Sequence, residues 1–223
     1  MGFRSVGQHP LLLRIVSRLR KRRFQILRQL LDAAAAPVTI LDIGGTATYW
    51  ELVTDGQVGE NLRITLLNTD SFPATHTNFS ALAGDGRSMP RFADKQFDIV
   101  FSNSTIEHVG DFNDQMRMAD EVRRVGRRYY VQTPNRYFPI EPHFIFPFFQ
   151  FLPVWLRVDL VLRLRLGWYG SRPTREQVLA DVTGIRMLTR RELRQLFPDA
   201  AIVDERWCGL VKSFVAYTDR PAA

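Results

Sequence analysis

The sequence predicts an α/β protein built on an open, mostly parallel sheet that ends in an antiparallel hairpin. Three observations predict it: short apolar runs typical of buried strands recur along the chain, helical sequence lies between most of them, and only a turn separates the last two. The strand-like runs are Val38–Ile43, Arg63–Asn68, Phe97–Ser102, Arg128–Thr133, Ala200–Cys208 and Val211–Thr218.

The C-terminal hairpin follows from the shortness of its connection. Gly209 and Leu210 alone join the last two runs, which is too little for the helical crossover that parallel strands require. The helix before them begins at Thr189, and Glu192 follows three residues later in the pattern of a capping box. We therefore expect a helix and then two antiparallel strands at the end of the sheet.

Length and composition favour one globular domain. The 223 residues are 45% hydrophobic, which is enough to bury a full core. The single cysteine, Cys208, excludes an intramolecular disulfide and a cysteine-based zinc cluster. This fits a reducing compartment, so we expect a cytoplasmic protein.

Positive charge is concentrated at the N-terminus. Residues 1–30 hold eight of the 30 basic residues and no acid, so the rest of the chain is close to neutral within its formal net charge of +7. A neutral body with one basic arm predicts a local contact with an anionic surface rather than a general nucleic-acid binder.

The basic arm carries the apolar periodicity of an amphipathic helix from Leu11 to Leu31. One interpretation is adsorption to anionic lipid at the inner face of the membrane. The other is a helix that packs on the domain and leaves its basic face in solvent. Arg14 interrupts the first apolar stretch, which argues against a secretory signal peptide. We divide the chain into this helical segment, residues 1–36, and an α/β domain, residues 37–223.

Residues 139–170 form a hydrophobic insertion after the fifth expected strand. Its longest nearly uncharged run, Phe144–Leu156, has 13 residues with two prolines, whereas a membrane-spanning helix needs about 20. We interpret the insertion as a lid over an acceptor pocket that also touches a membrane interface. The alternative is a pair of ordinary core helices broken at Pro153.

A glycine turn follows the first strand in the sequence Leu41-Asp42-Ile43-Gly44-Gly45-Thr46. Glycines at this point let the backbone turn sharply and approach a ligand closely. Such a turn serves several nucleotide-binding folds and also occurs for structural reasons alone, so it does not by itself identify the ligand.

Three further motifs make the pattern specific. They are GDGRSMP at Gly84–Pro90, FDIVFSNSTIEHV at Phe97–Val109 and TPNRYFP at Thr133–Pro139. In this order, over residues 38–140, the chain resembles the methyltransferase type 11 group of class I S-adenosylmethionine-dependent methyltransferases. The resemblance implies a Rossmann-like seven-stranded sheet with S-adenosylmethionine as cofactor.

The resemblance also implies which residues bind the cofactor. Around the end of the first strand, the residues that would contact the methionine and ribose of the cofactor are Asp42, Gly44, Gly45 and Thr46. At the end of the second strand, Asn68 or Asp70 would bind the ribose hydroxyls, and in the 84–90 loop Asp85 and Gly86 would bind the adenine. At the end of the fourth strand, Ser102 and Asn103 would lie beside the sulfonium methyl group. The chain departs from the family in keeping only the first glycine of the turn in register and in placing Asn68 where an acid is usual.

Methylation of an oxygen benefits from a base, and histidine is the side chain best suited near neutral pH. His143, just after the fifth strand, and His108, after the fourth, are the candidate catalytic residues; the alternative is that both are structural or bind substrate. His9 and His76 are expected on the surface. Glu141 and His143 are too few ligands to predict a metal.

The expected function is O-methylation of a small or lipid- or glycan-linked metabolite by in-line methyl transfer. The alternatives are a non-catalytic, membrane-associated binding protein of the same fold and an RNA methyltransferase. Nucleic acid is the less expected partner, because the charge lies in one leucine-bearing helix and no RNA-binding module is recognisable. A nicotinamide-dependent oxidoreductase would not explain the motifs at 84–109.

Overall fold

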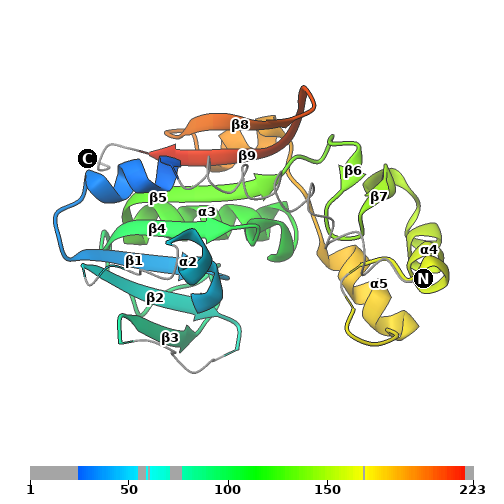
Figure 1. Ribbon diagram of the computed structural model, residues 1–223, viewed down its shortest axis with the longest axis horizontal. Helices are drawn as coiled ribbons and strands as arrows, with labels where there is room; N and C mark the ends of the chain where they lie inside the picture. The colour runs from blue at the N-terminus through cyan, green and yellow to red at the C-terminus, as the bar shows by residue number, and fades with distance from the viewer. Residues whose placement is uncertain (1–24, 55–58, 60, 71–76, 168, 219–223) are drawn as a thin grey trace.

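The computed structural model describes residues 25–54, 59, 61–70, 77–167 and 169–218. Within these ranges, seven strands form one sheet in the order β3-β2-β1-β4-β5-β9-β8 (Figure 1). The first five are parallel, and β9 runs antiparallel to both β5 and β8. The strands are β1 (Val38–Ile43), β2 (Leu62–Asn68), β3 (Phe79–Ala83), β4 (Phe97–Asn103), β5 (Gly126–Pro134), β8 (Ala201–Trp207) and β9 (Leu210–Thr218).

The predicted fold class is confirmed, and the six predicted strand runs correspond to β1, β2, β4, β5, β8 and β9. The runs did not include β3, which lies at the edge of the sheet. Only Phe79 of its five residues is buried, so β3 lacks the continuous apolar run that marks a central parallel strand.

Alternate side chains of the central strands point to opposite faces, as the pleat requires. Leu41 and Ile43 of β1 belong to a core that includes residues of α3 (Phe112–Val125) and α6 (Arg190–Leu196). Ile40 belongs to a second core that includes Trp50 of α2 (Ala47–Val53). The sheet is therefore covered on both faces, which explains its nearly unbroken apolar strands.

Helix α6 begins where the sequence predicted. The Thr189 side chain accepts a hydrogen bond from the Glu192 backbone nitrogen, and the Glu192 carboxylate accepts one from the Thr189 backbone nitrogen, which completes the predicted capping box. Helix α3 has an equivalent box between Asp111 and Asp114. These caps satisfy backbone N–H groups that a helix start otherwise leaves unpaired.

The N-terminal helix is described from residue 25, and residues 25–32 are helical. Leu27 and Leu30 are buried in the same core as Ile40. For this part of the arm, the interpretation of a helix packed on the domain is correct. Most of the predicted membrane-binding stretch, residues 11–24, lies outside the described residues, and its membrane contact stays a prediction.

The predicted insertion, residues 139–170, belongs to a larger unit, which we call the cap (the described residues of 139–185). It contains β6 (Ile140–Glu141), β7 (Phe146–Pro147), the 3-10 turn η3 (Phe149–Phe151), α4 (Val154–Leu164) and α5 (Arg175–Gly184). Figure 1 shows these elements beyond the carboxyl ends of β4 and β5. No helix among the described residues is long and apolar enough to span a membrane.

The cap has a separate hydrophobic core. Phe144, Phe149 and Val158 pack with residues of α5 such as Val178 and Val182. Helix α4 begins directly after Pro153, as the alternative interpretation of two helices broken at this proline required. The helices nevertheless lie outside the two sheet cores, so the insertion is an appended unit.

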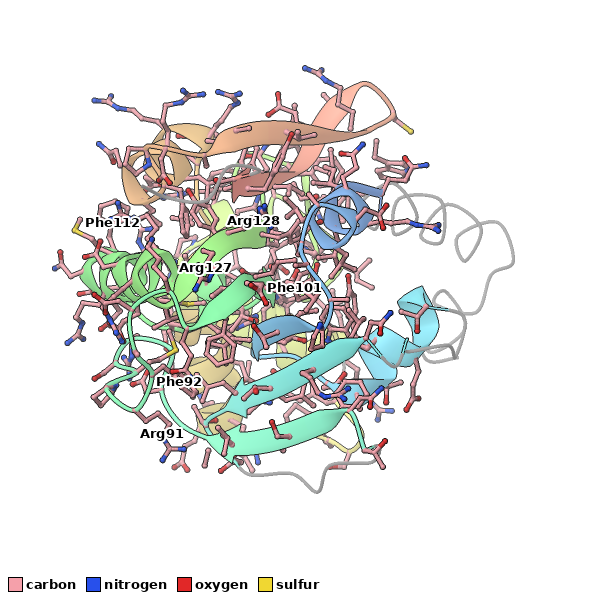
Figure 2. The ribbon with its side chains drawn as sticks, turned by 90° about the vertical axis from the view of Figure 1, so that its left-hand side faces the viewer. Arg91, Phe92, Phe101, Phe112, Arg127 and Arg128 are labelled. Carbon is pink, nitrogen blue, oxygen red and sulfur yellow. The ribbon has the colours of Figure 1, made fainter. Side chains whose placement is uncertain are left out.

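The amino ends of the parallel strands form the opposite end of the molecule, which faces the viewer in Figure 2. Arg91 and Arg127 are exposed there. Behind them Phe92 packs edge to face against Phe97, with ring centroids 5.0 Å apart. The predicted site residues lie instead at the carboxyl ends of the strands, beside the cap.

Candidate active site

Strand register brings the predicted cofactor residues to one edge of the sheet. Ile43 pairs with Leu67 of β2 on one side and with Ser102 of β4 on the other. The residues at the carboxyl ends of β1, β2 and β4 therefore meet at the same edge. In open α/β sheets this edge is where ligands bind.

The glycine turn after β1 is closely surrounded. Gly44 has a positive φ of 77°, and a Cβ on it would overlap the side chain of Thr105. The Thr105 hydroxyl donates a hydrogen bond to the Ile43 carbonyl oxygen at 3.1 Å. A Cβ on Gly45 would overlap the carboxylate of Asp42. Both glycines are therefore needed for packing.

Asp42 is fully buried behind this turn. Its Oδ2 accepts a hydrogen bond from Trp50 Nε1 at 2.7 Å. Among the described residues, its Oδ1 has no hydrogen-bond partner. Burial raises the pKa of Asp42 to about 7, although the Trp50 hydrogen bond acts in the opposite direction.

Asn68 ends β2 beside the same turn. Its Nδ2 donates a hydrogen bond to the Gly45 carbonyl oxygen at 3.0 Å, so it helps to hold the turn. Asp70 is exposed two residues later. Of the two candidates for ribose recognition, Asn68 is the one joined to the glycine turn. Thr46, also predicted here, is exposed and is the N-cap residue of α2 without a side-chain capping bond.

Asp85, predicted to recognise adenine, forms an ion pair with Arg87 within its own loop. Arg87 Nη2 lies 2.7 Å from Asp85 Oδ2, and Arg87 Nε lies 3.0 Å from Oδ1. The hydrogen bond from Arg87 outweighs partial desolvation and lowers the pKa of Asp85. The neighbouring Gly86 is buried, and a Cβ on it would lie 2.9 Å from Ile43. Nothing in the sequence indicated that Arg87 would bind this carboxylate.

Ser102 and Asn103 end β4, and they differ in exposure. Ser102 is fully buried and its hydroxyl donates a hydrogen bond to the Ile43 carbonyl at 3.3 Å, which joins β4 to β1. Asn103 is half-buried at the strand end. Of the two, Asn103 is better placed to meet a ligand.

The two predicted catalytic histidines lie together although they come from different loops. His108 ends η2 (Ile106–His108), which follows β4, and His143 lies between β6 and β7. Their rings meet edge to face, with centroids 4.8 Å apart. His9 and His76 lie outside the described residues. Each histidine was a candidate on its own, and the structure shows one cluster.

Glu141 orients His143. Its Oε1 lies 2.6 Å from His143 Nδ1, and its Oε2 accepts a hydrogen bond from the Phe144 backbone nitrogen at 2.7 Å. A carboxylate at Nδ1 favours the tautomer with hydrogen on that atom. The Nε2 atom of His143 is then the nitrogen that has a lone pair for another partner.

The two histidines are shifted in opposite directions. Burial lowers the pKa of His143, but the hydrogen bond and charge of Glu141, with the charge of Glu107, outweigh it and raise that pKa overall. The His108 ring is partly exposed, yet desolvation and the charge of His143 lower its pKa to about 4. At neutral pH His108 is therefore uncharged.

A cavity of about 350 Å³ lies beside the histidines, with walls from the cap. In this wall the Tyr169 hydroxyl donates a hydrogen bond to Asp181 Oδ2 at 2.7 Å. The lining residues are His108, His143, Phe144, Gly167, Tyr169, Ala180, Asp181, Gly184 and Ile185. Sequence reasoning missed Tyr169 and Asp181, because nothing in their local sequence distinguishes them from surface residues of a helical segment.

Glu107 is the third polar group of the cluster and was not among the predicted site residues. It is buried, and its Oε2 accepts a hydrogen bond from Thr133 Oγ1 of β5 at 3.0 Å. Glu107, His108 and His143 each have a potential ligand atom for a metal within 4.8 Å of the others. The sequence-based judgement against a metal considered Glu141 and His143 only.

Comparison with known families identifies residues 57–128 as matching the family model of a type 11 methyltransferase domain. Two uncharacterized proteins from strains of Mycobacterium tuberculosis are each 39% identical over 57 residues, which is 26% of this chain and 20% of the relative. The match thus spans about a fifth of the length of these curated relatives. It covers a segment of the domain and leaves the rest of both chains unaligned.

Solved structures extend the likeness over most of the chain. A didemethyltoxoflavin N1-methyltransferase of Burkholderia thailandensis has a TM-score of 0.53 at 13% identity, covering 92% of this chain and 79% of that one. An exported protein of Bordetella parapertussis has a TM-score of 0.54 at 13% identity, with coverages of 90% and 67%. NodS, an N-methyltransferase of Bradyrhizobium japonicum, has a TM-score of 0.50 at 12% identity, with coverages of 89% and 85%.

At these identities the solved structures show the fold. The family match over residues 57–128 and the strand order together support the sequence-based recognition of a class I methyltransferase domain of the type 11 group, a group whose cofactor is S-adenosylmethionine. They do not bear on the individual residues predicted to bind the cofactor, which stay predictions.

Proposed function

The chain carries a methyltransferase domain of the type 11 group, and we propose that it transfers the methyl group of S-adenosylmethionine to a hydroxyl group held in the cavity beneath the cap. One observation carries the proposal. His143, which Glu141 holds through Nδ1, and His108 line that cavity, and their loops follow the carboxyl ends of β5 and β4. This is the sheet edge at which the family's cofactor is expected.

The residues at this edge fit the cofactor chemically. Asp42 has a buried carboxylate oxygen that lacks a partner among the described residues, which suits the ammonium group of the methionine portion. Asn68, Asp85 and Asn103 supply further polar groups around the turn. When bound, the cofactor supplies a methyl group on a sulfonium that is already a good leaving group, so the protein has to align the acceptor and exclude water.

His143 is the proposed general base. Its Nε2 takes the proton of the acceptor hydroxyl as the oxygen–methyl bond forms and the sulfur–methyl bond breaks. Glu141 holds the ring through Nδ1 and stabilises the charge that the ring gains. His108 has its pKa lowered to about 4, so it is the weaker base and serves to orient the acceptor.

A lipid- or glycan-linked acceptor is proposed because the cap has large exposed apolar side chains. Trp155 is 66% exposed and Phe148 is 56% exposed. Phe151 is also exposed and stacks on Tyr137, with ring centroids 6.2 Å apart. Exposed apolar side chains of this size are typical of surfaces that contact apolar partners.

Kinetics of two variants test the catalytic roles. His143→Ala should lower kcat by about 100-fold or more, because general-base catalysis contributes roughly that much. His108→Ala should mainly raise KM, and His76→Ala, at a histidine that the sequence predicts on the surface, serves as a control. Near-wild-type turnover in both cluster variants would contradict the role of the histidines.

A non-catalytic binding protein is the second candidate, favoured by the Asp85–Arg87 pair that occupies the predicted adenine acceptor. Calorimetric titration with S-adenosylmethionine separates the two. Measurable binding supports the enzyme, whereas no heat at millimolar ligand supports the binding protein.

We place the protein in the cytoplasm, peripherally at the inner face of the membrane, on the basis of the basic arm. The described part of that arm packs on the domain through Leu27 and Leu30, which leaves residues 1–24 for the lipid contact. Vesicles with anionic lipid should retain the full chain and release a chain without residues 1–24. Equal recovery of both chains in the supernatant would refute the placement.

A further inference from the structure

We infer that Glu107, His108 and His143 form a binding site for one divalent transition-metal cation in the wall of the cavity. Their potential ligand atoms all lie within 4.8 Å of one another. Ligands about 2.0–2.2 Å from a common ion are separated by roughly 3–4 Å, so a small contraction completes the site. One carboxylate and two imidazoles come from two loops that the sheet holds together.

The surroundings hold two of the three ligands in position. Thr133 of β5 donates its hydroxyl hydrogen bond to Glu107, which fixes a carboxylate that is already buried. Glu141 holds His143 through Nδ1 at 2.6 Å and is itself fixed by the Phe144 backbone nitrogen. A carboxylate behind a histidine is the usual arrangement by which proteins orient a metal ligand and make it more basic.

Two of the three proposed ligands, His108 and His143, line the cavity of about 350 Å³. Three protein ligands with one open position are the pattern of catalytic zinc sites, including sites with two histidines and one glutamate. Imidazole ligands favour zinc, cobalt, nickel or iron over magnesium and calcium. Asp181 and Glu141 add negative charge near the site, which favours a cation.

A bound cation changes the way in which the acceptor is activated, and this consequence rests on the proposed function. With the cation in place, His143 Nε2 is a ligand and no longer a base. A cation held by these residues would lower the pKa of an acceptor hydroxyl at its open position, and the proton of that hydroxyl would pass to solvent water. The binding of the cation itself does not depend on methyl transfer.

The test measures metal binding without cofactor or acceptor. Full-length protein freed of metal by a chelator and dialysis is titrated with Zn²⁺ by calorimetry and with Co²⁺ by visible absorption. We expect one cation per chain. His108→Ala and His143→Ala should abolish binding in the measured range, and Glu141→Gln should weaken it about 10- to 100-fold.

Two controls keep the result interpretable. His108 is exposed, so His108→Ala should keep the wild-type Tm in the absence of metal, and loss of binding then reflects loss of a ligand. A double variant with His9→Ala and His76→Ala should bind as the wild type does. Binding that survives His108→Ala and His143→Ala, or that disappears in the His9/His76 variant, overturns the site.

Failure of this inference is distinguishable from failure of the proposed function. Methyl transfer that persists in chelator-treated protein, with no binding of Zn²⁺ or Co²⁺, refutes the metal site and leaves the proposed function intact. One bound cation in a protein that methylates no acceptor and binds no S-adenosylmethionine refutes the proposed function and leaves the metal site intact.

Discussion

Trp50 and Asp42 form a hydrogen bond in the interior, 2.7 Å from indole nitrogen to carboxylate oxygen, directly behind the glycine turn. Both side chains are fully buried. Burial raises the pKa of Asp42 to about 7, whereas the same group in an unfolded chain has a pKa of 3.8. The folded protein therefore holds a proton between about pH 4 and 7 that the unfolded chain releases.

This difference predicts how stability depends on pH. Because the folded state binds more protons in that interval, the free energy of unfolding falls as pH rises from about 4 to 7. Asp42→Asn should remove this slope, since the amide oxygen can still accept the Trp50 hydrogen bond without any charge. We expect the variant to gain more stability over the wild type at pH 8 than at pH 5.

Denaturant unfolding of both proteins at pH 5 and pH 8 checks this prediction. The difference between the free energies of unfolding of the variant and the wild type should grow by up to about 1.4 kcal/mol for each pH unit between about pH 4 and 7. Parallel pH profiles for the two proteins would show that Asp42 is ionised in the folded state. The same variant should bind S-adenosylmethionine more weakly if Asp42 faces the ammonium group, which calorimetry measures.

Gly45 gives a second prediction. A Cβ there would overlap the Asp42 carboxylate, which is buried and bound to Trp50, so it has no space to move away. Gly45→Ala should therefore cost about 1–3 kcal/mol of stability, the usual range for overpacking. Gly170→Ala is the matched control, because a Cβ on Gly170 has no atom within 4 Å. Equal unfolding midpoints for the two variants would contradict the packing argument.

The sequence predicted the sheet well because its central strands are buried on both faces. Val38–Ile43 was predicted with the bounds that β1 has, since five of its six residues are buried and four of the six are aliphatic. Edge strand β3 gave no such signal. The cap was recognised as an insertion, but its separate core depends on pairing α4 with α5, which local sequence does not specify.

The site was predicted in part for a similar reason. Asp42, Asn68 and Asn103 were correctly placed at one edge of the sheet, because strand ends are marked in the sequence and parallel strands share one edge. The contacts of Arg87 with Asp85, Glu141 with His143 and Tyr169 with Asp181 depend on side-chain directions within loops. Those directions come from tertiary packing, so no sequence period could have indicated them.

The Asp85–Arg87 pair leads to a prediction on cofactor affinity. Arg87 occupies both carboxylate oxygens of Asp85, so it competes with an adenine amino group for the same acceptor. Asp85→Asn should weaken S-adenosylmethionine binding about tenfold, because a charged acceptor is replaced by a neutral one. Arg87→Ala should tighten binding by freeing the carboxylate. Calorimetry on both variants tests this, and a loss of affinity in Arg87→Ala would show that Arg87 supports the site.

The exposed aromatic side chains of the cap give the last prediction. Trp155→Ala and Phe151→Ala should leave Tm within about one degree of the wild type, because surface substitutions change stability little. Both should raise KM for a lipid-linked acceptor about tenfold, since burying a large apolar side chain contributes roughly 1.5–3 kcal/mol. A short soluble acceptor that carries the same hydroxyl should show an unchanged KM.

Met116→Ala provides the matched control, because Met116 is 42% exposed and belongs to α3, which is not part of the cap. It should change neither KM nor Tm. An equal rise in KM for the soluble acceptor would mean that the cap variants distort the cavity, because a lost apolar contact affects only the acceptor that has the apolar part. An unchanged KM for both acceptors would show that the exposed aromatic groups do not bind the acceptor and that the cavity residues form the whole acceptor site.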